Sequence, residues 1–236
     1  MGLETRACKA PDRRAPRLPR LVCLVDLDAA CGREASGITS ALLDDFEEAT
    51  LVYARLSISE LGEDDAPPCP AFARPEGARA REGAAAAGEA RRHPDALVVA
   101  FSADGMEAPP EKRAEALAER IANALPARLT PPPRSRAYGI CATAGADSAP
   151  ACSMLGALGT WCGGQGLLWS GGVAVAGSKA LEGALGTARM GVRRRYASEA
   201  LDELVCAVRS GTDAGVIEAR PGIAAIALGL LRRQGR

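Results

Sequence analysis

The sequence predicts an α/β protein in which a five-stranded parallel sheet lies between two layers of helices. Short, continuously apolar segments of strand length recur along the chain, as expected for parallel strands that are buried on both faces. Segments of helix length separate them, and this alternation is typical of βαβ units. A chain of 236 residues, 47% of them hydrophobic, is large enough for one well-packed domain of this kind.

The first βα unit begins after a basic, proline-rich stretch at residues 1–20, which we interpret as a flexible arm. Leu21 to Asp26 is an apolar run that predicts the first strand. Ile38 to Glu48 then places apolar residues at helical spacing and predicts the first long helix. Leu51 to Leu56 predicts the second strand, and the Pro-, Gly- and acid-rich stretch at residues 57–83 predicts an irregular insertion in the domain 21–236.

The remaining elements follow the same alternation. Their expected bounds are a strand at 95–101, a helix at 111–125, a strand at 137–142, a helix at 148–162 and a strand at 167–176. Residues 179–210 are mostly helical in pattern, and three glycines at positions 183, 186 and 191 indicate that the first part is broken. Arg193 to Arg195 indicate either a solvated helix face or cations that meet a nucleotide phosphate.

The segment from Trp161 to Leu181 combines a helix end, a buried strand and a glycine turn. The glycines around Gln165 permit positive φ and end a helix. The pair Gly171-Gly172 interrupts the strand that follows, which indicates that another backbone or a flat ligand approaches closely. Gly177 begins a turn at the carboxyl end of that strand, so the segment has the features of a site.

The composition excludes several function classes. Lys plus Arg and Asp plus Glu both total 29, so there is no general electrostatic attraction to nucleic acid. Eight cysteines without a C-x-x-C pair and a single histidine do not match the usual zinc spacing, and we predict no metal site. Cys162 is predicted to be buried and unreactive.

The sequence pattern also predicts neither a secretory signal nor a membrane-spanning segment. Residues 1–20 lack the apolar core of a secretory signal, so we expect a cytoplasmic protein with reduced thiols. The uncharged stretch from Ser148 to Ser178 is divided by Pro150 and by many glycines, and it does not predict a membrane-spanning helix.

In its later half the chain resembles the flavodoxin-like superfamily, specifically the small NAD(P)H-dependent FMN-reductase-like oxidoreductases. The residues that carry the resemblance are Trp161, Cys162, Gly166, Leu167, Trp169, Gly171, Gly172 and Gly177. The resemblance implies a flavodoxin-like three-layer sandwich with strand order 2-1-3-4-5. It also implies an oxidoreductase in which FMN passes hydride equivalents from NAD(P)H to a small-molecule electron acceptor, within a homodimer. The flavin performs the redox chemistry, so no catalytic side chain is expected.

The resemblance also implies where FMN binds, in loops at the carboxyl ends of the strands. After the first strand, Gly32, Arg33, Ser36 and Thr39 would hold the phosphate. Residues expected to line the flavin ring in the next two loops are Ser102, Gly105, Thr143 and Gly145. The chain departs from the family at Asp26-Leu27-Asp28, whose two carboxylates would repel a phosphate, and in the loop after Ser102, which lacks the family's ring-stacking aromatic residue.

These departures leave two alternatives open. The first is a divergent flavodoxin-fold protein that has lost FMN and acts as a binding or interaction module. The second is a Mg²⁺-dependent phosphatase of the D-x-D type, with Asp26 as nucleophile, Asp28 as general acid and Ser102 at the end of a neighbouring strand.

Overall fold

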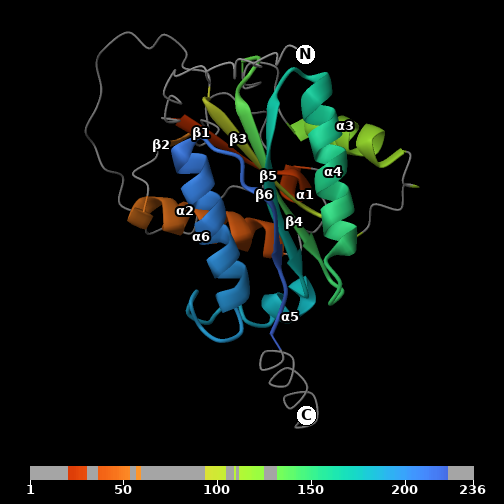
Figure 1. Cartoon of the computed structure of the whole chain (residues 1–236). Coiled ribbons are helices and arrows are strands. Elements are labelled where there is room, and N and C mark those ends of the chain that lie inside the picture. The colour runs from red at the N-terminus through yellow and green to blue at the C-terminus, as the bar shows by residue number, and fades with distance from the viewer. Residues whose placement is uncertain are drawn as a thin grey trace, which may run out of the picture.

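The computed structural model describes residues 21–30, 37–53, 57–59, 94–104, 109, 112–124 and 132–222. The fold is a parallel α/β sheet with helices on both faces (Figure 1). The strands are β1 (Leu21–Asp26), β2 (Ser57–Ser59), β3 (Ala96–Ser102), β4 (Arg136–Thr143), β5 (Leu168–Ala176) and β6 (Gly215–Ala219). All described pairings are parallel, and the order across the sheet is β2-β1-β3-β4-β5-β6.

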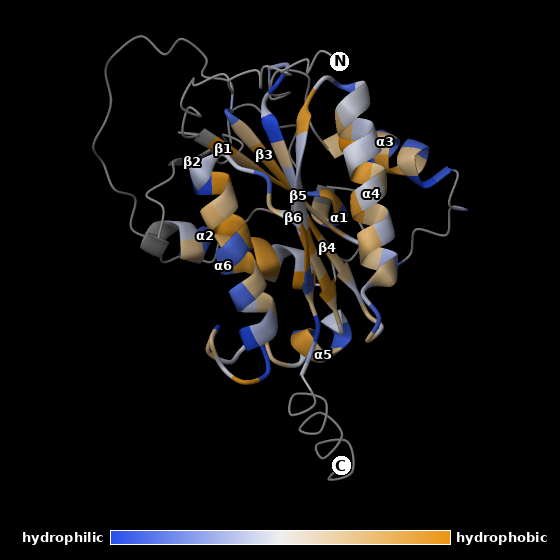
Figure 2. Ribbon diagram, viewed as in Figure 1, coloured by the Kyte–Doolittle hydropathy of each residue, from blue (hydrophilic) through white to orange (hydrophobic). Residues whose placement is uncertain are grey.

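The helices separate into two layers. They are α1 (Leu27–Ala30), α2 (Ile38–Tyr53), α3 (Arg113–Ala124), α4 (Ala149–Gly164), α5 (Ser178–Glu182) and α6 (Arg195–Ser210). Side chains of α2, α5 and α6 pack on one face of the sheet in a cluster that includes Phe46 and Tyr138. Side chains of α1, α3 and α4 pack on the other face around Phe101. α6 shows both hydrophilic and hydrophobic positions in Figure 2, and its apolar residues Leu201, Leu204 and Val205 pack on the sheet.

The predicted α/β sandwich with an all-parallel sheet is confirmed, but two details of the expected sheet are wrong. The strand expected at Leu51 to Leu56 is wrong over its first half, because α2 continues to Tyr53, and residues 54–56 lie outside the described residues. The edge strand β2 begins at Ser57, in the expected insertion. Within the described residues the sheet has six strands rather than five, since β6 adds to β5. The arm at residues 1–20 and the rest of the insertion, residues 60–83, lie outside the described residues.

The paired glycines of β5 allow neighbouring backbones to approach. Between β4 and β5 the register shifts, so that Gly171 lies in an irregularity of the ladder with φ of 99°. A Cβ on Gly171 would lie 2.0 Å from the carbonyl oxygen of Gly215, and one on Gly172 would lie 2.2 Å from that of Gly139. Of the two meanings predicted for this pair, the close approach of another backbone is therefore the one the structure has.

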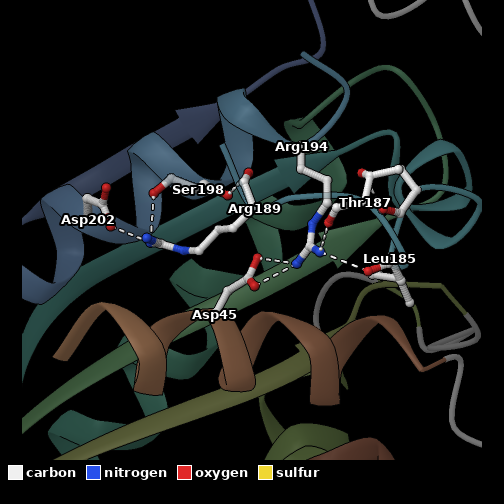
Figure 3. Close-up of polar contacts among 8 residues, drawn as sticks. Asp45, Leu185, Thr187, Arg189, Arg194, Ser198 and Asp202 are labelled. Atoms are coloured by element: carbon white, nitrogen blue, oxygen red, sulfur yellow. Dashed lines mark hydrogen bonds and ion pairs between the residues drawn. The ribbon is translucent and has the colours of Figure 1, made fainter. Parts of the chain in front are cut away.

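The turns between α5 and α6 are fixed by one buried and one partly buried ion pair (Figure 3). Nη2 of Arg194 donates to both carboxylate oxygens of Asp45 in α2, at 2.6 and 2.7 Å. Its Nη1 donates to the carbonyls of Leu185 and Thr187, each at 2.9 Å. Arg189 pairs with Asp202 in α6. Arg194 is only 8% exposed, so the interpretation of this residue as part of a solvated face is wrong.

Candidate functional site

The carboxyl ends of β1, β3 and β4 lie next to one another and bring polar residues from three loops to one edge of the sheet. Asp26 at the end of β1 is in register with Ala100 of β3, and Ser102 of β3 is in register with Ala142 of β4. Ligands of open parallel sheets bind at this edge, where the strand order reverses. In this sheet the reversal lies between β1 and β3.

Asp26 holds the start of α1 and the first turn of α2. Its Oδ1 accepts the backbone N–H groups of Asp28 and Ala29, at 3.0 and 3.1 Å. Its Oδ2 accepts the hydroxyl of Ser40 at 2.9 Å. The side chain is buried, and both carboxylate oxygens already have donors. Asp26 therefore acts as a local cap that ties the loop after β1 to α2.

Asp28 is buried and paired with a cation. Its Oδ1 accepts a hydrogen bond from Nη2 of Arg120 in α3, and its Oδ2 accepts the backbone N–H of Ser102 at 2.8 Å. Burial raises the pKa of the Asp28 carboxyl above its ordinary value, an effect that Arg120 partly counters. Because Arg120 neutralises Asp28, the negative charge that would repel a phosphate at this edge is smaller than the sequence alone indicates.

Asp104 connects the loops after β3 and β4. Its Oδ2 accepts the backbone N–H of Ala144 at 2.5 Å, and its Oδ1 is 3.4 Å from the hydroxyl of Thr143, which donates to it. The hydroxyl of Ser102 accepts the N–H of Asp104 at 3.1 Å. The carbonyl of Gly145 accepts the N–H of Gly177 at 2.6 Å. The N–H of Ala144 and the carbonyl of Gly145, in a loop expected to line the flavin ring, are thus bonded within the protein.

Besides Nη1 of Arg120, the buried polar atom at this edge that lacks a hydrogen-bond partner among the described residues belongs to Thr39. It lies in the first turn of α2 and is fully buried, and its hydroxyl makes no hydrogen bond. Thr50, equally buried near the other end of α2, instead donates to the carbonyl of Glu47 at 2.7 Å. A buried hydroxyl without a partner costs about 1–3 kcal/mol, so it calls for an explanation such as a ligand that bonds to it.

Four of the eight predicted site residues are described, and all four lie at this edge of the sheet: Thr39, Ser102, Thr143 and Gly145. Gly32, Arg33, Ser36 and Gly105 lie outside the described residues. The sequence did not indicate Arg120 and Asp104. Arg120 lies beside the apolar stripe of α3 that contains Leu117 and Ile121, and this placement is the one sequence signal that could have drawn attention to it.

The other expectations concern metal, membrane and thiols. Within the described ranges, no group of three His, Cys, Asp or Glu residues could hold a metal ion. None of the helices in the described part is both long and apolar enough to cross a membrane. Cys162 is buried, as predicted, and burial raises the pKa of its thiol to about 12.

Comparison with known proteins gives no relative. No protein-family model, no curated protein and no solved structure matches this chain. The case for a function therefore comes from the geometry of the edge formed by the carboxyl ends of β1, β3 and β4, here called the carboxyl edge.

Proposed function

We propose that the protein is a flavodoxin-like flavoprotein that binds FMN at the carboxyl edge of its sheet and passes electrons from NAD(P)H to a small acceptor. In this proposal β2-β1-β3-β4-β5 is the flavodoxin-like sheet and β6 is an addition to it. FMN, when bound, supplies the redox chemistry, and the chain's own residues bind and orient it. Its phosphate would lie at the first turn of α2, and its ring beside the loops that follow β3 and β4.

The observation that carries the proposal is the buried, unpartnered hydroxyl of Thr39. It lies in the first turn of a sixteen-residue helix, where backbone N–H groups without intrahelical partners and the helix dipole favour an anion. The neutralisation of Asp28 by Arg120 removes part of the repulsion that a phosphate would meet nearby. These two features support a phosphate site at the first turn of α2.

The loops that would hold the flavin ring favour a second candidate function. Asp104 already accepts the N–H of Ala144, and the carbonyl of Gly145 is bonded to Gly177. Phe101, the aromatic residue near the end of β3, is fully buried and offers no surface for stacking. A divergent protein that has lost FMN and binds a partner through this edge would show these features. The phosphatase hypothesis gains less, because Asp26 and Asp28 are both engaged by protein donors.

The test is an absorbance spectrum of the purified protein, followed by an FMN titration that measures fluorescence quenching. We expect binding, and we expect Thr39→Val to weaken it by about tenfold or more, since a hydrogen bond to a charged group contributes roughly 1.5–3 kcal/mol. Thr50→Val is the matched control, because it changes the same residue type in the same helix at a hydroxyl with a local partner. FMN affinity should not change in the control.

The stability of the FMN-free protein gives a second test, in which the two variants should shift the free energy of unfolding in opposite directions. Thr39→Val removes an unpaired buried hydroxyl and should raise the free energy of unfolding by about 1 kcal/mol, whereas Thr50→Val should lower it by about that amount. A colourless protein that leaves FMN fluorescence unchanged would overturn the flavin proposal in favour of the second candidate. Equal FMN affinity in Thr39→Val and the wild type would remove Thr39 from the phosphate site.

A further inference from the structure

Arg120 is a largely buried arginine whose guanidinium is only partly hydrogen-bonded. Its side chain is 13% exposed, and its Nη2 donates to Oδ1 of Asp28. Its Nη1 is buried and has no partner among the described residues. A buried donor without a partner destabilises a protein, and the effect is larger when the donor belongs to a charged group. Because Nη1 is also shielded from bulk water, it needs an acceptor that the described part of the chain does not supply.

The buried Arg194 shows how this fold satisfies a guanidinium that serves only the structure. Its Nη2 donates to both carboxylate oxygens of Asp45, and its Nη1 donates to two backbone carbonyls. Both terminal nitrogens of Arg194 therefore have acceptors within the protein. Arg120 has an acceptor for only one of them, although it too is paired with a buried aspartate. This difference indicates that Nη1 of Arg120 is left for a ligand.

Arg120 reaches the carboxyl edge from the side opposite the proposed phosphate site. It lies on α3, which packs on one face of the sheet, whereas α2 with Thr39 packs on the other face. Asp28 joins Arg120 to the backbone N–H of Ser102, at the end of β3. A ligand whose phosphate lies at α2 and whose ring lies beside the loop after β3 would therefore bring its ring to the side of Arg120.

The ion pair of Arg120 limits the kind of acceptor that Nη1 can take. Asp28 already neutralises the guanidinium, so little net charge is left to attract a second anion. The remaining N–H groups of Nη1 are donors that a neutral carbonyl oxygen can accept. The isoalloxazine ring of FMN carries such carbonyl oxygens at the edge of its pyrimidine part. A ring carbonyl therefore matches this donor better than a phosphate does.

We propose that Nη1 of Arg120 donates a hydrogen bond to a ring carbonyl of FMN and so orients the ring at the carboxyl edge. This inference rests on the proposed function, and it adds a contact that the family resemblance does not imply. Asp28 is then a positioning residue, because its carboxylate holds one terminal nitrogen of the guanidinium while the other is left for the ring.

The test compares the binding of FMN with that of riboflavin, which has the same ring and no phosphate, by fluorescence quenching with the full chain. Lysine can keep the ion pair with Asp28 but lacks the second terminal nitrogen, so Arg120→Lys should weaken both ligands by about tenfold. Thr39→Val should weaken FMN alone. Arg136→Lys is the matched control, because Arg136 pairs with Asp213 at the start of β4, on the opposite edge of the sheet, and both affinities should stay unchanged.

Circular dichroism and the melting temperature verify that each variant is folded. If Arg120→Lys does not fold, the double variant Arg120→Met/Asp28→Asn takes its place with the same expected losses, because it leaves no unpaired charge at the site.

Each way in which the inference can fail gives a different result. Equal affinities in Arg120→Lys and the wild type would show that Nη1 does not contact the ring. A loss of FMN binding without a loss of riboflavin binding in Arg120→Lys would place Arg120 at the phosphate instead. A wild type that binds FMN but not riboflavin would overturn the ring contact and leave the proposed function standing. A wild type that binds neither would overturn the proposed function, and this inference with it.

Discussion

Arg194 and Asp45 join two helices that are far apart in the sequence through one buried guanidinium and one buried carboxylate. The Nη2 of Arg194 bonds to both oxygens of Asp45, and its Nη1 bonds to the carbonyls of Leu185 and Thr187. The two residues are 149 positions apart. This pair fixes the turns that lead into α6 against α2, next to the carboxyl edge of the sheet.

Removing Asp45 should therefore cost much of the protein's stability. Asp45→Ala leaves the buried Arg194 without its counter-ion, and breaking a buried pair in this way costs about 3–5 kcal/mol. The measurement is urea denaturation followed by circular dichroism. Glu199→Gln is the control, because Glu199 pairs with Arg195 on an exposed helix face and its removal should leave the denaturation midpoint unchanged. Equal midpoints for Asp45→Ala and the wild type would contradict the prediction.

The glycine in the irregular part of β5 allows a second stability prediction. Gly171→Ala places a Cβ 2.0 Å from the carbonyl oxygen of Gly215 at a backbone φ of 99°, so β5 and β6 must separate. We expect a loss of several kcal/mol, or no folded protein at all. Gly156→Ala is the counterpart, because the new Cβ has open space within a helix and should stabilise the protein by roughly 0.5–1 kcal/mol. A mild effect of Gly171→Ala on the melting temperature would show that the strands can adjust.

The apolar pattern predicted the central strands because their residues are buried on both faces of the sheet, and it predicted the helices because each buries one apolar side against the sheet. β3, for example, is buried at every position. The same pattern misplaced the second strand, since Leu51 to Leu56 alternates enough for a strand while α2 continues through Ala49 and Thr50, both fully buried. β6 escaped notice because it is an edge strand in which only Ala219 is buried.

The site also contains residues that a local sequence pattern can predict and contacts between distant residues that it cannot predict. The carboxyl ends of strands are local features that predict where a site lies, and the family resemblance then implied Thr39, Ser102 and Thr143 as its residues. Arg120 lies 92 residues from Asp28, and Asp104 lies 40 residues from Ala144. The sequence showed two carboxylates two positions apart, but the cation that neutralises one of them comes from a distant helix. No local pattern specifies such a pair.

The pair of Asp28 and Arg120 predicts a pH dependence. Folding raises the pKa of Asp28, so its contribution to stability is fully present below its unfolded pKa and is lost as the pH rises through the raised folded value. Arg120→Met removes the main countering cation and should raise that pKa further. The unfolding free energy of the variant should then fall more steeply than that of the wild type above pH 3.8, by about 1.4 kcal/mol for each unit of added pKa shift.

The control for this prediction is the double variant Arg120→Met/Asp28→Asn, which has no carboxyl at the site and should lose the extra slope. The measurement is urea denaturation at a series of pH values between the acid range and neutrality. Parallel profiles for Arg120→Met and the wild type would mean that Arg120 does not control the ionisation of Asp28. The proposed neutralisation of this edge would then lose its basis.

The described cysteines should differ sharply in reactivity. Burial raises the pKa of the thiols of Cys23 and Cys162 to about 11 and about 12, and it also raises that of the buried Cys141. Since the thiolate is the reactive form, these three should resist alkylation at mildly alkaline pH until the protein unfolds. Cys206 is exposed and should react in the native state, and Cys206→Ser removes that signal. Mass spectrometry of peptides from native and urea-treated protein measures the alkylation of each cysteine in the two states. Labelling of Cys162 in the native protein would show that the end of α4 opens.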